Sequence, residues 1–489
     1  MSLNIKRIII AVIGLFFLGS LLIVGAIENN KRTLGKKAAI KVSATSKNCV
    51  DCHTVKNPSL VEQWRDSKHA IRGVACMDCH EAQKTDVDAW EHEGHSIAVI
   101  VSPKDCSKCH ARENQEFQES HHADAGKILG SLDNVLAEVV EGNTGRLGLD
   151  GNSPAAVNGC WQCHGSVVKI GKDGRPTPAT WPNTGIGRIN PDGSKGSCTA
   201  CHSRHTFSPV VARQPDSCGK CHLGPDHPQK EIYEESKHGI AFKAFKEYMK
   251  LDVQPWRVGI EYTAAPTCAT CHMSATQEQN VTHDVGRRIS WNLRPPISEK
   301  IDAKAIKAGK LVESWEQRRK NMKNVCSKCH SEKYVDGFYV QFDSAINLYN
   351  EKYGMPSTKI IKMMKAGGVL TATAFDEELE WTYFYLWHHE GRRARHGAAM
   401  MAPDYTQWHG FFEVAERFYI HFVPQVKEAC EKAIHEGGEK MVAAKEVLKE
   451  LDTILNKEEH KWFLGKMSGD EKASRNAAAE EFKKRYAQN

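Results

Sequence analysis

One motif, Cys-x-x-Cys-His, occurs eight times between residues 49 and 330 of this 489-residue chain. Two cysteines at this spacing form thioether bonds with the vinyl groups of a haem, and the histidine that follows becomes the proximal ligand of its iron. The motifs use 16 of the 17 cysteines and leave only Cys430, which we expect to be a small buried residue in a helix. Because a histidine follows every second cysteine, a disulfide framework and zinc ribbons are both disfavoured. The sequence therefore predicts eight c-type haems.

Each motif supplies two thioether cysteines and one proximal histidine. The eight motifs are Cys49-Cys52-His53, Cys76-Cys79-His80, Cys106-Cys109-His110, Cys160-Cys163-His164, Cys198-Cys201-His202, Cys218-Cys221-His222, Cys268-Cys271-His272 and Cys326-Cys329-His330. Residues 49–330 provide about 35 residues per haem, which is too little chain to wrap each porphyrin separately. We therefore expect closely stacked haems that replace much of the usual aliphatic core.

The overall charge of the polypeptide is weakly basic. Lysine and arginine number 66 against 60 aspartates and glutamates, for a formal charge of +6. Each haem adds two propionates, so we expect the assembled protein to be near neutral or slightly acidic. The basic balance therefore predicts no binding to nucleic acid.

The chain begins with a candidate export sequence. Residues 8–27 carry no charge and follow Lys6 and Arg7, a pattern that fits either a signal peptide or a single membrane-spanning anchor. Both alternatives export the rest of the chain, and c-type haem is attached outside the bacterial cytoplasm. We therefore predict a periplasmic protein with a signal peptide or anchor at residues 1–30 and a polar linker at residues 31–47.

The remaining chain divides at the last motif into a predicted octahaem domain, residues 48–335, and a C-terminal helical domain, residues 336–489. The second part is rich in Ala, Glu, Lys and Leu, with apolar residues three and four positions apart. Strand patterns are scarce, so we predict a mainly α fold. Helices are expected near residues 338–353, 374–390, 406–435, 439–456 and 470–487.

A haem that only carries electrons keeps a second imidazole opposite the proximal one, whereas a catalytic haem leaves that position open for substrate. Sixteen histidines lie outside the motifs, and three of them share the pattern Ser-x-His followed by a small residue. Seven are predicted to be distal ligands, which would leave one haem open: His69, His92, His122, His205, His238, His283 and His396. The last position is also open to His389 or His409.

Two features suggest where the open haem lies. Loops rich in Gly, Pro and Asn, residues 141–159 and 171–197, flank the fourth motif, either as walls of a pocket or as plain surface loops. Asp226 and His227 are adjacent in a turn between two prolines and are candidates for proton transfer. The alternative is that His227 is an axial ligand and that Asp226 only stabilises the turn.

Several long stretches resemble the hydroxylamine oxidoreductase family of octahaem cytochromes c, from Cys49 to about Val423. They are CWQCHG, GSCTACHSRHTFS, CGKCHLGPDHPQ, YTAAPTCATCHMS, THDVGRRISWNLRP and HEGRRARHGAAMMAPDYTQWHG. The resemblance implies a mostly helical fold, often trimeric, in which the haem at His164 is the active site and Asp226 and His227 lie on its distal side. All eight motifs end in His, which disfavours nitrite or tetrathionate reductases that use a proximal Lys.

The family resemblance also bears on the direction of the reaction. In oxidising members a tyrosine near the C-terminus, from a neighbouring subunit, is bonded covalently to the catalytic haem. Tyr405 is at about the corresponding place, with Tyr383, Tyr385 and Tyr419 as alternatives. We therefore predict oxidation of hydroxylamine to nitric oxide or nitrite, with electrons passed to a c-type or quinone-linked membrane cytochrome. The alternatives are reduction of nitrite or hydroxylamine to ammonium, and a non-catalytic electron conduit.

Overall fold

The computed structural model describes residue 40 and residues 42–130 and 149–487, and it forms two compact units. The first unit comprises residues 1–110 and 126–208, and the second comprises residues 111–125 and 209–489. This division differs from the predicted boundary at residue 335. The reason is that Tyr339 and Phe342, after the last motif, share a hydrophobic core with Trp291 and Met322, before it.

The predicted signal peptide or anchor lies outside the described residues. Within the described part of the chain, no helix is both long enough and apolar enough to cross a membrane. The predicted linker ends in a helix, because α2 begins at Ala44 with the side chain of Ser43 accepting a hydrogen bond from its first turn.

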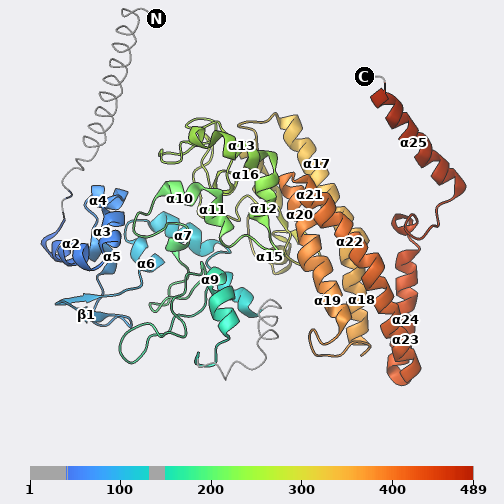
Figure 1. The fold of residues 1–489 in the computed structure, drawn as a ribbon, viewed down its shortest axis with the longest axis horizontal. Helices are drawn as coiled ribbons and strands as arrows, with labels where there is room; N and C mark the ends of the chain where they lie inside the picture. Colours follow the sequence, from blue (N-terminus) through green and yellow to red (C-terminus); the bar gives the residue numbers. More distant parts are fainter. Residues whose placement is uncertain (1–39, 41, 131–148, 488–489) are drawn as a thin grey trace, which may run out of the picture. The chain divides into compact units, whose positions relative to one another are not determined.

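The first unit consists of short helices and irregular loops (Figure 1). Its described elements are α2 (Ala44–Lys56), α3 (Pro58–Arg65), α4 (Lys68–Ile71), α5 (Cys76–His80), β1 (Trp90–His92), β2 (His95–Ile97), α6 (Pro103–Ser107), η3 (Ala156–Cys160), α9 (Trp161–His164) and η4 (Cys198–Ala200). A further short helix, η1 (Ala125–Gly130), begins at the last residue of the segment that belongs to the second unit. The strands β1 and β2 form an antiparallel hairpin that pairs Trp90 with Ile97.

The described part of the first unit buries few large apolar side chains. Its main cluster is formed by Val50, Val61 and Trp64 with the small residues Ala70 and Ala75. A unit of this length normally needs a larger apolar core to be stable. The thin core agrees with the expectation that haem macrocycles replace aliphatic side chains.

The second unit is more regular. Before the last motif it contains α7 (Ala111–Glu119), α10 (Pro209–Arg213), α11 (Pro215–Gly219), α12 (Gln229–Glu235), α13 (Lys237–Phe245), η5 (Lys246–Met249), α14 (Cys268–His272), β3 (Trp291–Asn292), β4 (Glu299–Lys300), α15 (Ala303–Lys307) and α16 (Trp315–Cys326). After it come α17 (Glu332–Tyr349), η6 (Asn350–Gly354), α18 (Met355–Ala366), α19 (Glu378–Phe384), η7 (Tyr385–Glu390), α20 (Gly391–Met400), α21 (Pro403–Thr406), η8 (Gln407–Phe412), α22 (Glu413–Glu416), η9 (Arg417–Phe422), α23 (Val423–Glu436), α24 (Gly438–Leu455), η10 (Glu458–His460) and α25 (Gly469–Ala487).

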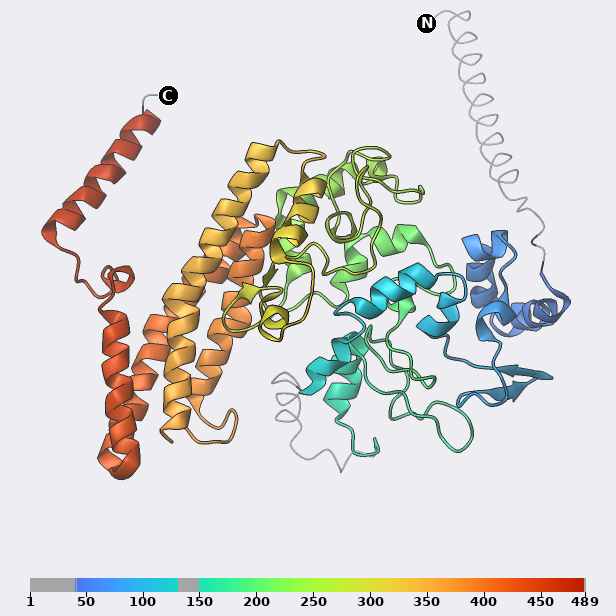
Figure 2. The same cartoon turned by 180° about the vertical axis from the view of Figure 1, so that it is seen from behind.

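The C-terminal helices confirm the mainly α prediction, and α23 and α24 form a helical hairpin that both cartoon views show side by side (Figures 1 and 2). Two helices, α18 and α20, were not predicted. In α20 the glycines disguised the helical pattern, yet both are needed for packing. A Cβ atom at Gly391 would lie 2.5 Å from the ring of Tyr349, and one at Gly397 would lie 2.6 Å from the backbone nitrogen of Thr406.

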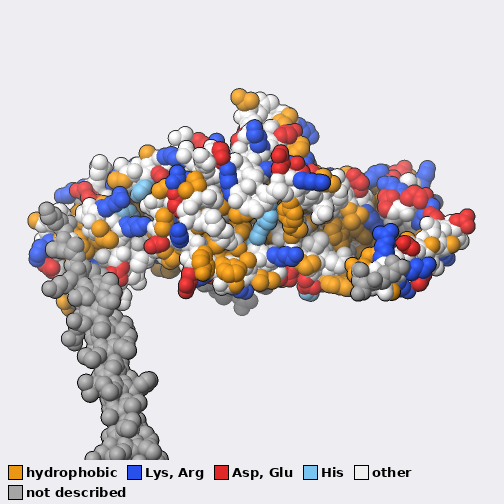
Figure 3. Space-filling view, turned by 90° about the horizontal axis from the view of Figure 1, so that it is seen from above, with side chains coloured by type: hydrophobic (Ala, Val, Ile, Leu, Met, Phe, Trp, Pro, Cys, Tyr) orange, Lys and Arg blue, Asp and Glu red, His pale blue; other side chains and the backbone are white. Residues whose placement is uncertain are grey.

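Exposure separates the motif cysteines from the remaining one. All 16 motif cysteines are exposed or partly exposed residues. Cys430 is fully buried in α23, which confirms the prediction for that residue. On the face drawn in Figure 3, positive and negative side chains are interspersed among hydrophobic side chains and histidines.

A buried arginine ties α20 to the loop before β4. The guanidinium of Arg395 donates to the carbonyl oxygens of Trp387 (3.1 Å) and Pro295 (3.0 Å) and to the hydroxyl oxygen of Ser298 (2.8 Å). Its guanidinium carbon also lies 4.1 Å from the ring centre of Tyr349. Because this charge is buried, its stability depends on these partners.

We predict that Arg395→Met destabilises the protein strongly. The substitution leaves several buried acceptors without a donor, which costs about 3 kcal/mol or more. Thermal unfolding followed by circular dichroism should show a clearly lower Tm than for the wild type. Arg475→Met, at an exposed position of α25, is the control and should leave the Tm unchanged. Equal values for the two variants would contradict the structural role of Arg395.

Candidate haem centres and a proton-handling cluster

A single turn of helix brings the three ligating groups of a motif together. In α5 and α14 the helix spans the motif from the first cysteine to the histidine. Positions i, i+3 and i+4 of a helix share one face, so both sulfurs and the imidazole lie on the same side. In α14 the hydroxyl of Thr267 caps this turn by accepting a hydrogen bond from the backbone nitrogen of Thr270 (3.3 Å).

Several proximal histidines are oriented by oxygen acceptors at Nδ1. His80 Nδ1 lies 2.8 Å from the carbonyl oxygen of Ala98, and His272 Nδ1 lies 3.1 Å from that of Val285. When Nδ1 carries the proton that is donated to oxygen, the lone pair of Nε2 is available to a metal. These residues therefore fit a haem iron bound through Nε2.

The spacing of histidine rings tests whether the chain fits iron with two axial imidazoles. A metal–imidazole bond of about 2 Å and a ring radius of about 1.2 Å place the two ring centres about 6.4 Å apart. Five motif histidines have another imidazole at this spacing within the same unit. The pairs are His53–His92 (6.1 Å), His80–His205 (6.4 Å), His110–His69 (6.2 Å), His222–His122 (6.1 Å) and His330–His238 (6.0 Å).

The repeated Ser-x-His pattern has a structural cause in two of its three occurrences. Ser67 is the N-cap of α4 and Ser236 is the N-cap of α13, and each hydroxyl accepts from the backbone nitrogen three residues later (3.1 Å in both). The cap holds His69 and His238 in the first turn of their helices. The small residue that follows is also required, because a Cβ atom at Gly239 would lie 1.9 Å from a backbone oxygen.

Contacts between cysteines show which motifs are neighbours. In the first unit the sulfur of Cys106 interacts with that of Cys198, which joins the third motif to the fifth. In the second unit the sulfurs of Cys218 and Cys268 interact and join the sixth motif to the seventh. The haems attached there are therefore linked to the chain at adjacent points, as close stacking requires.

The loop after the fourth motif is built onto it. The backbone nitrogens of Ile186 and Gly187 donate to the carbonyl oxygens of Cys163 (3.0 Å) and His164 (3.1 Å). The approach is so close that a Cβ atom at Gly185 would lie 2.0 Å from a neighbouring backbone nitrogen. This part of the predicted loop therefore supports the fourth motif directly and is not a plain surface loop.

Asp226 is the centre of a polar cluster in the second unit. Its carboxylate oxygens lie 3.3 Å from His227 Nδ1, 3.4 Å from a guanidinium nitrogen of Arg392 and 3.9 Å from His388 Nε2. A carboxylate shared by two imidazoles and a guanidinium can hold and pass protons. The ring of His227 also lies 6.2 Å from that of His222, so the alternative of an axial ligand keeps structural support.

Sequence analysis missed His388 and Arg392, although their spacing could have revealed them. His388, Arg392 and His396 are four residues apart, which places them on one face of the continuous segment η7–α20. The sequence had instead indicated the neighbouring His389 as an alternative distal ligand. The spacing of four residues between His388, Arg392 and His396 was the better indicator of the polar cluster.

His283 and His396 remain predicted distal ligands. The backbone nitrogen of His283 donates to Glu116 (2.8 Å). His396 is buried, with Nε2 3.5 Å from the side-chain nitrogen of Gln229. Burial, followed by the nearby Arg395 guanidinium, holds the pKa of His396 well below its usual value. This keeps the imidazole neutral, as a metal ligand must be.

Tyr405 lies in α21, where its backbone nitrogen is 3.3 Å from a carboxylate oxygen of Glu235 and its ring is 5.6 Å from that of His409. Its side chain is partly exposed, and its crosslinking role stays a prediction. Among the alternatives, Tyr383 and Tyr419 are less suitable, because each hydroxyl is hydrogen-bonded within the helical core.

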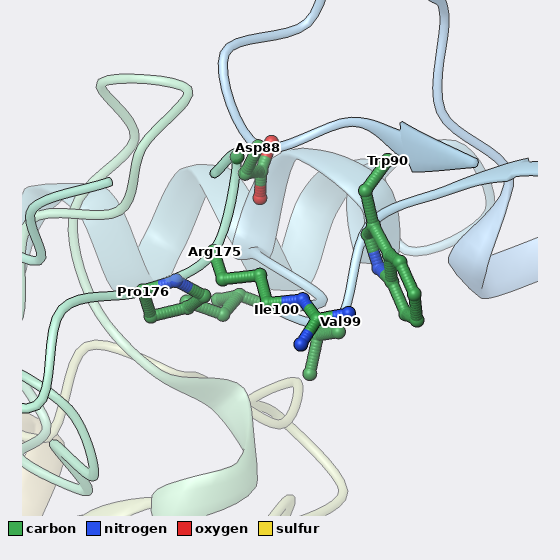
Figure 4. Close-up of a pocket in the computed structure, with 7 residues that line it drawn as sticks. Asp88, Trp90, Val99, Ile100, Arg175 and Pro176 are labelled. Carbon is green, nitrogen blue, oxygen red and sulfur yellow. The ribbon is translucent and has the colours of Figure 1, made fainter. Parts of the chain in front are cut away.

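A small cavity in the first unit is lined by Asp88, Trp90, Val99, Ile100, Gly174, Arg175 and Pro176 (Figure 4). The Arg175 guanidinium carbon lies 5.0 Å from the ring centre of Trp90, and burial raises the pKa of Asp88. The cavity volume of about 10 Å³ is that of a single water molecule, so it is not a substrate chamber.

Residues 191–376 match the family described as "Seven times multi-haem cytochrome CxxCH", and residues 25–99 match the family described as "Cytochrome c554 and c-prime". The chain is a multihaem cytochrome c. This cytochrome binds iron as c-type haem.

Two curated relatives are similar to part of this cytochrome. A probable nitrite reductase-hydroxylamine oxidoreductase fusion protein from Kuenenia stuttgartiensis is 28% identical over 332 residues, or 59% of this chain and 34% of that one. A high-molecular-weight cytochrome c from Nitratidesulfovibrio vulgaris is 24% identical over 209 residues, or 40% of this chain and 33% of that one. This cytochrome therefore spans about one third of the length of each relative.

Two solved structures share the fold. One, titled a hypothetical multiheme protein, has a TM-score of 0.68 at 24% identity and covers 81% of this cytochrome and 100% of that chain. The other, a reducing HAO-like protein complex from Kuenenia stuttgartiensis, has a TM-score of 0.54 at 19% identity and covers 80% of this cytochrome and 86% of that chain. At these identities the likeness concerns the fold alone.

We predict that His238→Ala opens the haem attached at the last motif. Loss of the imidazole opposite His330 should convert one ferric haem from low spin to high spin, measured by electron paramagnetic resonance. His409→Ala is the control, because His409 is exposed and its ring nitrogens lie near Asp404 and Glu413. A high-spin signal in the control beyond that of the wild type, or no additional high-spin signal in His238→Ala, would contradict the assigned pair.

A second pair of variants tests the sixth motif, where two imidazoles compete. We predict that His122→Ala creates a new high-spin haem opposite His222, whereas His227→Ala leaves the spin state of that haem unchanged. The reason is that His227 Nδ1 lies 3.3 Å from the Asp226 carboxylate, so this histidine belongs to the polar cluster. Electron paramagnetic resonance spectra of both variants test this assignment. A new high-spin haem in His227→Ala and none in His122→Ala would make His227 the ligand.

Proposed function

We propose that this protein is an exported octahaem cytochrome c that converts small nitrogen compounds at the haem of the fourth motif. The other seven haems each have two axial histidines and carry electrons. The observation that carries the proposal is the set of five imidazole pairs at the spacing of trans ligands. Such pairs suit electron carriers and leave the chemistry to a different haem. The printed name of the Kuenenia relative supports nitrogen compounds as substrates.

We assign proton transfer in this reaction to Asp226 and His227. Arg392 stabilises the negative charge of the Asp226 carboxylate, and that carboxylate lies 3.3 Å from His227 Nδ1, where it can accept a proton from the ring. His227 Nε2 is then the atom that would accept or donate the substrate proton. The haem iron, when bound, supplies the binding site for substrate nitrogen and the exchange of electrons.

The direction that we propose first is oxidation of hydroxylamine to nitric oxide or nitrite, with Tyr405 as the residue that would modify the haem. Tyr405 is partly exposed, which suits a tyrosine that reaches a neighbouring subunit. The alternative is reduction of nitrite or hydroxylamine to ammonium, and the words "nitrite reductase" in the relative's name favour it. A non-catalytic conduit would require a protein ligand on the fourth haem as well.

The proposed assembly is a homotrimer in the periplasm, which residues 8–27 either anchor to the membrane or leave free after cleavage. Its proposed electron partner is a c-type cytochrome or a quinone-linked membrane cytochrome. Exposed aromatic side chains that follow Tyr405 in the chain support an interface there. Trp408 and Phe412 are each about half exposed, and their rings are 5.4 Å apart. Large apolar side chains grouped on a surface commonly mark a contact with another protein.

The test combines spectroscopy with assays in both directions. We predict one high-spin ferric haem in the wild type and oxidation of hydroxylamine with a c-type cytochrome as acceptor. His227→Ala should lower kcat about 100-fold, because general acid–base catalysis contributes about that much. Tyr405→Phe should abolish a tyrosine–haem adduct found by peptide mapping, and with it the oxidation.

Three outcomes would change the proposal in different ways. An entirely low-spin spectrum of the wild type would support only the non-catalytic electron conduit. Full turnover by His227→Ala would remove its proton role. Ammonium formation without any adduct would establish the reductive alternative.

A further inference from the structure

The segment that joins α18 to α19 gathers three carboxyl groups. Asp376 and Glu377 end the loop and Glu380 lies in the first turn of α19, and one oxygen atom from each lies within 4.8 Å of the others. Glu380 is only 8% exposed, whereas Asp376 reaches the surface. The group is therefore partly enclosed by protein and open to solvent on one side.

Two buried oxygen atoms of these carboxyl groups accept no hydrogen bond from the described residues. Thr371 Oγ1 lies 2.9 and 2.8 Å from the two oxygens of Asp376, and the Thr371 backbone nitrogen donates to Glu377 Oε1 (2.7 Å). Glu380 Oε1 forms an ion pair with Lys365. The second oxygens, Glu377 Oε2 and Glu380 Oε2, are buried and have no hydrogen-bond partner among the described residues. A buried carboxylate oxygen without a partner is costly.

The charges do not balance either. Three carboxylates carry three negative charges, and Lys365 compensates one of them, so two remain. A single divalent cation would balance this charge and would bind the two unpartnered oxygens at once. Calcium binds six to eight oxygens at about 2.3–2.6 Å in flexible geometry, so oxygens on opposite sides of it are about 5 Å apart. Three oxygens within 4.8 Å of one another fit that sphere without rearrangement.

We propose that Asp376, Glu377 and Glu380 form a binding site for a divalent cation of the calcium class. The remaining ligands are water molecules on the side of Asp376 that faces solvent. The cation joins the loop after α18 to the first turn of α19. That helix continues into η7, which carries His388 beside Asp226, so the site also steadies the segment that supports the polar cluster.

The competing explanation is a proton in place of the cation. Burial raises the pKa of Glu377, the hydrogen bond from the Thr371 backbone lowers it, and the carboxyl groups of Asp376 and Glu380 raise it further. A protonated Glu377 would relieve part of the repulsion. The two explanations differ in a measurable way, because a cation that replaces the proton releases it on binding and stabilises the fold.

The experiment uses the full-length protein with its haems, freed of metal by a chelator and titrated with calcium or magnesium chloride. We expect one calcium ion per chain by calorimetry and elemental analysis, release of protons, and a higher Tm with calcium than without. Asp376→Asn and Glu377→Gln should each weaken calcium binding at least tenfold and remove most of the Tm increase. Glu378→Gln is the matched control, because its side chain is exposed and lies next to the site in sequence but outside it.

Each other result overturns the proposal. No calcium uptake by the wild type, or a Tm that calcium does not change, leaves the shared proton as the explanation. Equal calcium binding by wild type, Asp376→Asn and Glu377→Gln would place the ion elsewhere, for instance on haem propionates. Tighter binding of magnesium than of calcium would overturn the calcium class. Turnover is not measured, so the outcome is independent of the proposed function.

Discussion

The rest of the structure depends on one constraint. Two sulfurs and one imidazole from a single helical turn must bond to the same haem. A turn such as α14 can point all three groups to one side, but it can supply only one axial ligand. The second imidazole must come from another part of the chain. The ring pair of His80 and His205, which are 125 residues apart, shows how one iron can connect distant segments of an otherwise thin fold.

The two units meet this constraint with different amounts of ordinary protein core. In the described part of the first unit, the apolar cluster around Trp64 contains only a handful of side chains, so we expect the attached haems to provide much of the packing. The second unit adds helices whose side chains, such as Ile346, Ile360 and Leu451, are almost completely buried without any haem. These helices provide a rigid support for polar residues that must stay at set positions.

The sequence was most informative where a short local pattern carries the structure. The motifs and the capped histidines His69 and His238 are of this kind, because a few neighbouring residues determine the geometry. It was least informative where function depends on distant segments. Arg392 and His388 meet Asp226 across more than 160 residues, and the wide helical turns of η7 decide which side chains face it. The compact units divide elsewhere than near residue 335, because packing across the last motif joins the residues before it to those after it.

The course of the chain between the units agrees with the distal ligands that we propose. Residues 111–125 belong to the second unit, although the chain before and after them belongs to the first. Within this segment α7 is held by Glu116, which accepts from the backbone of His283, and the segment places His122 opposite His222. Without it, His227 would be the imidazole nearest to His222 at ligand spacing and would have to leave the polar cluster to bind iron. The inserted segment thus supplies His122 as the ligand that we propose for the sixth motif, and His227 stays beside Asp226 for the proton transfer that we propose.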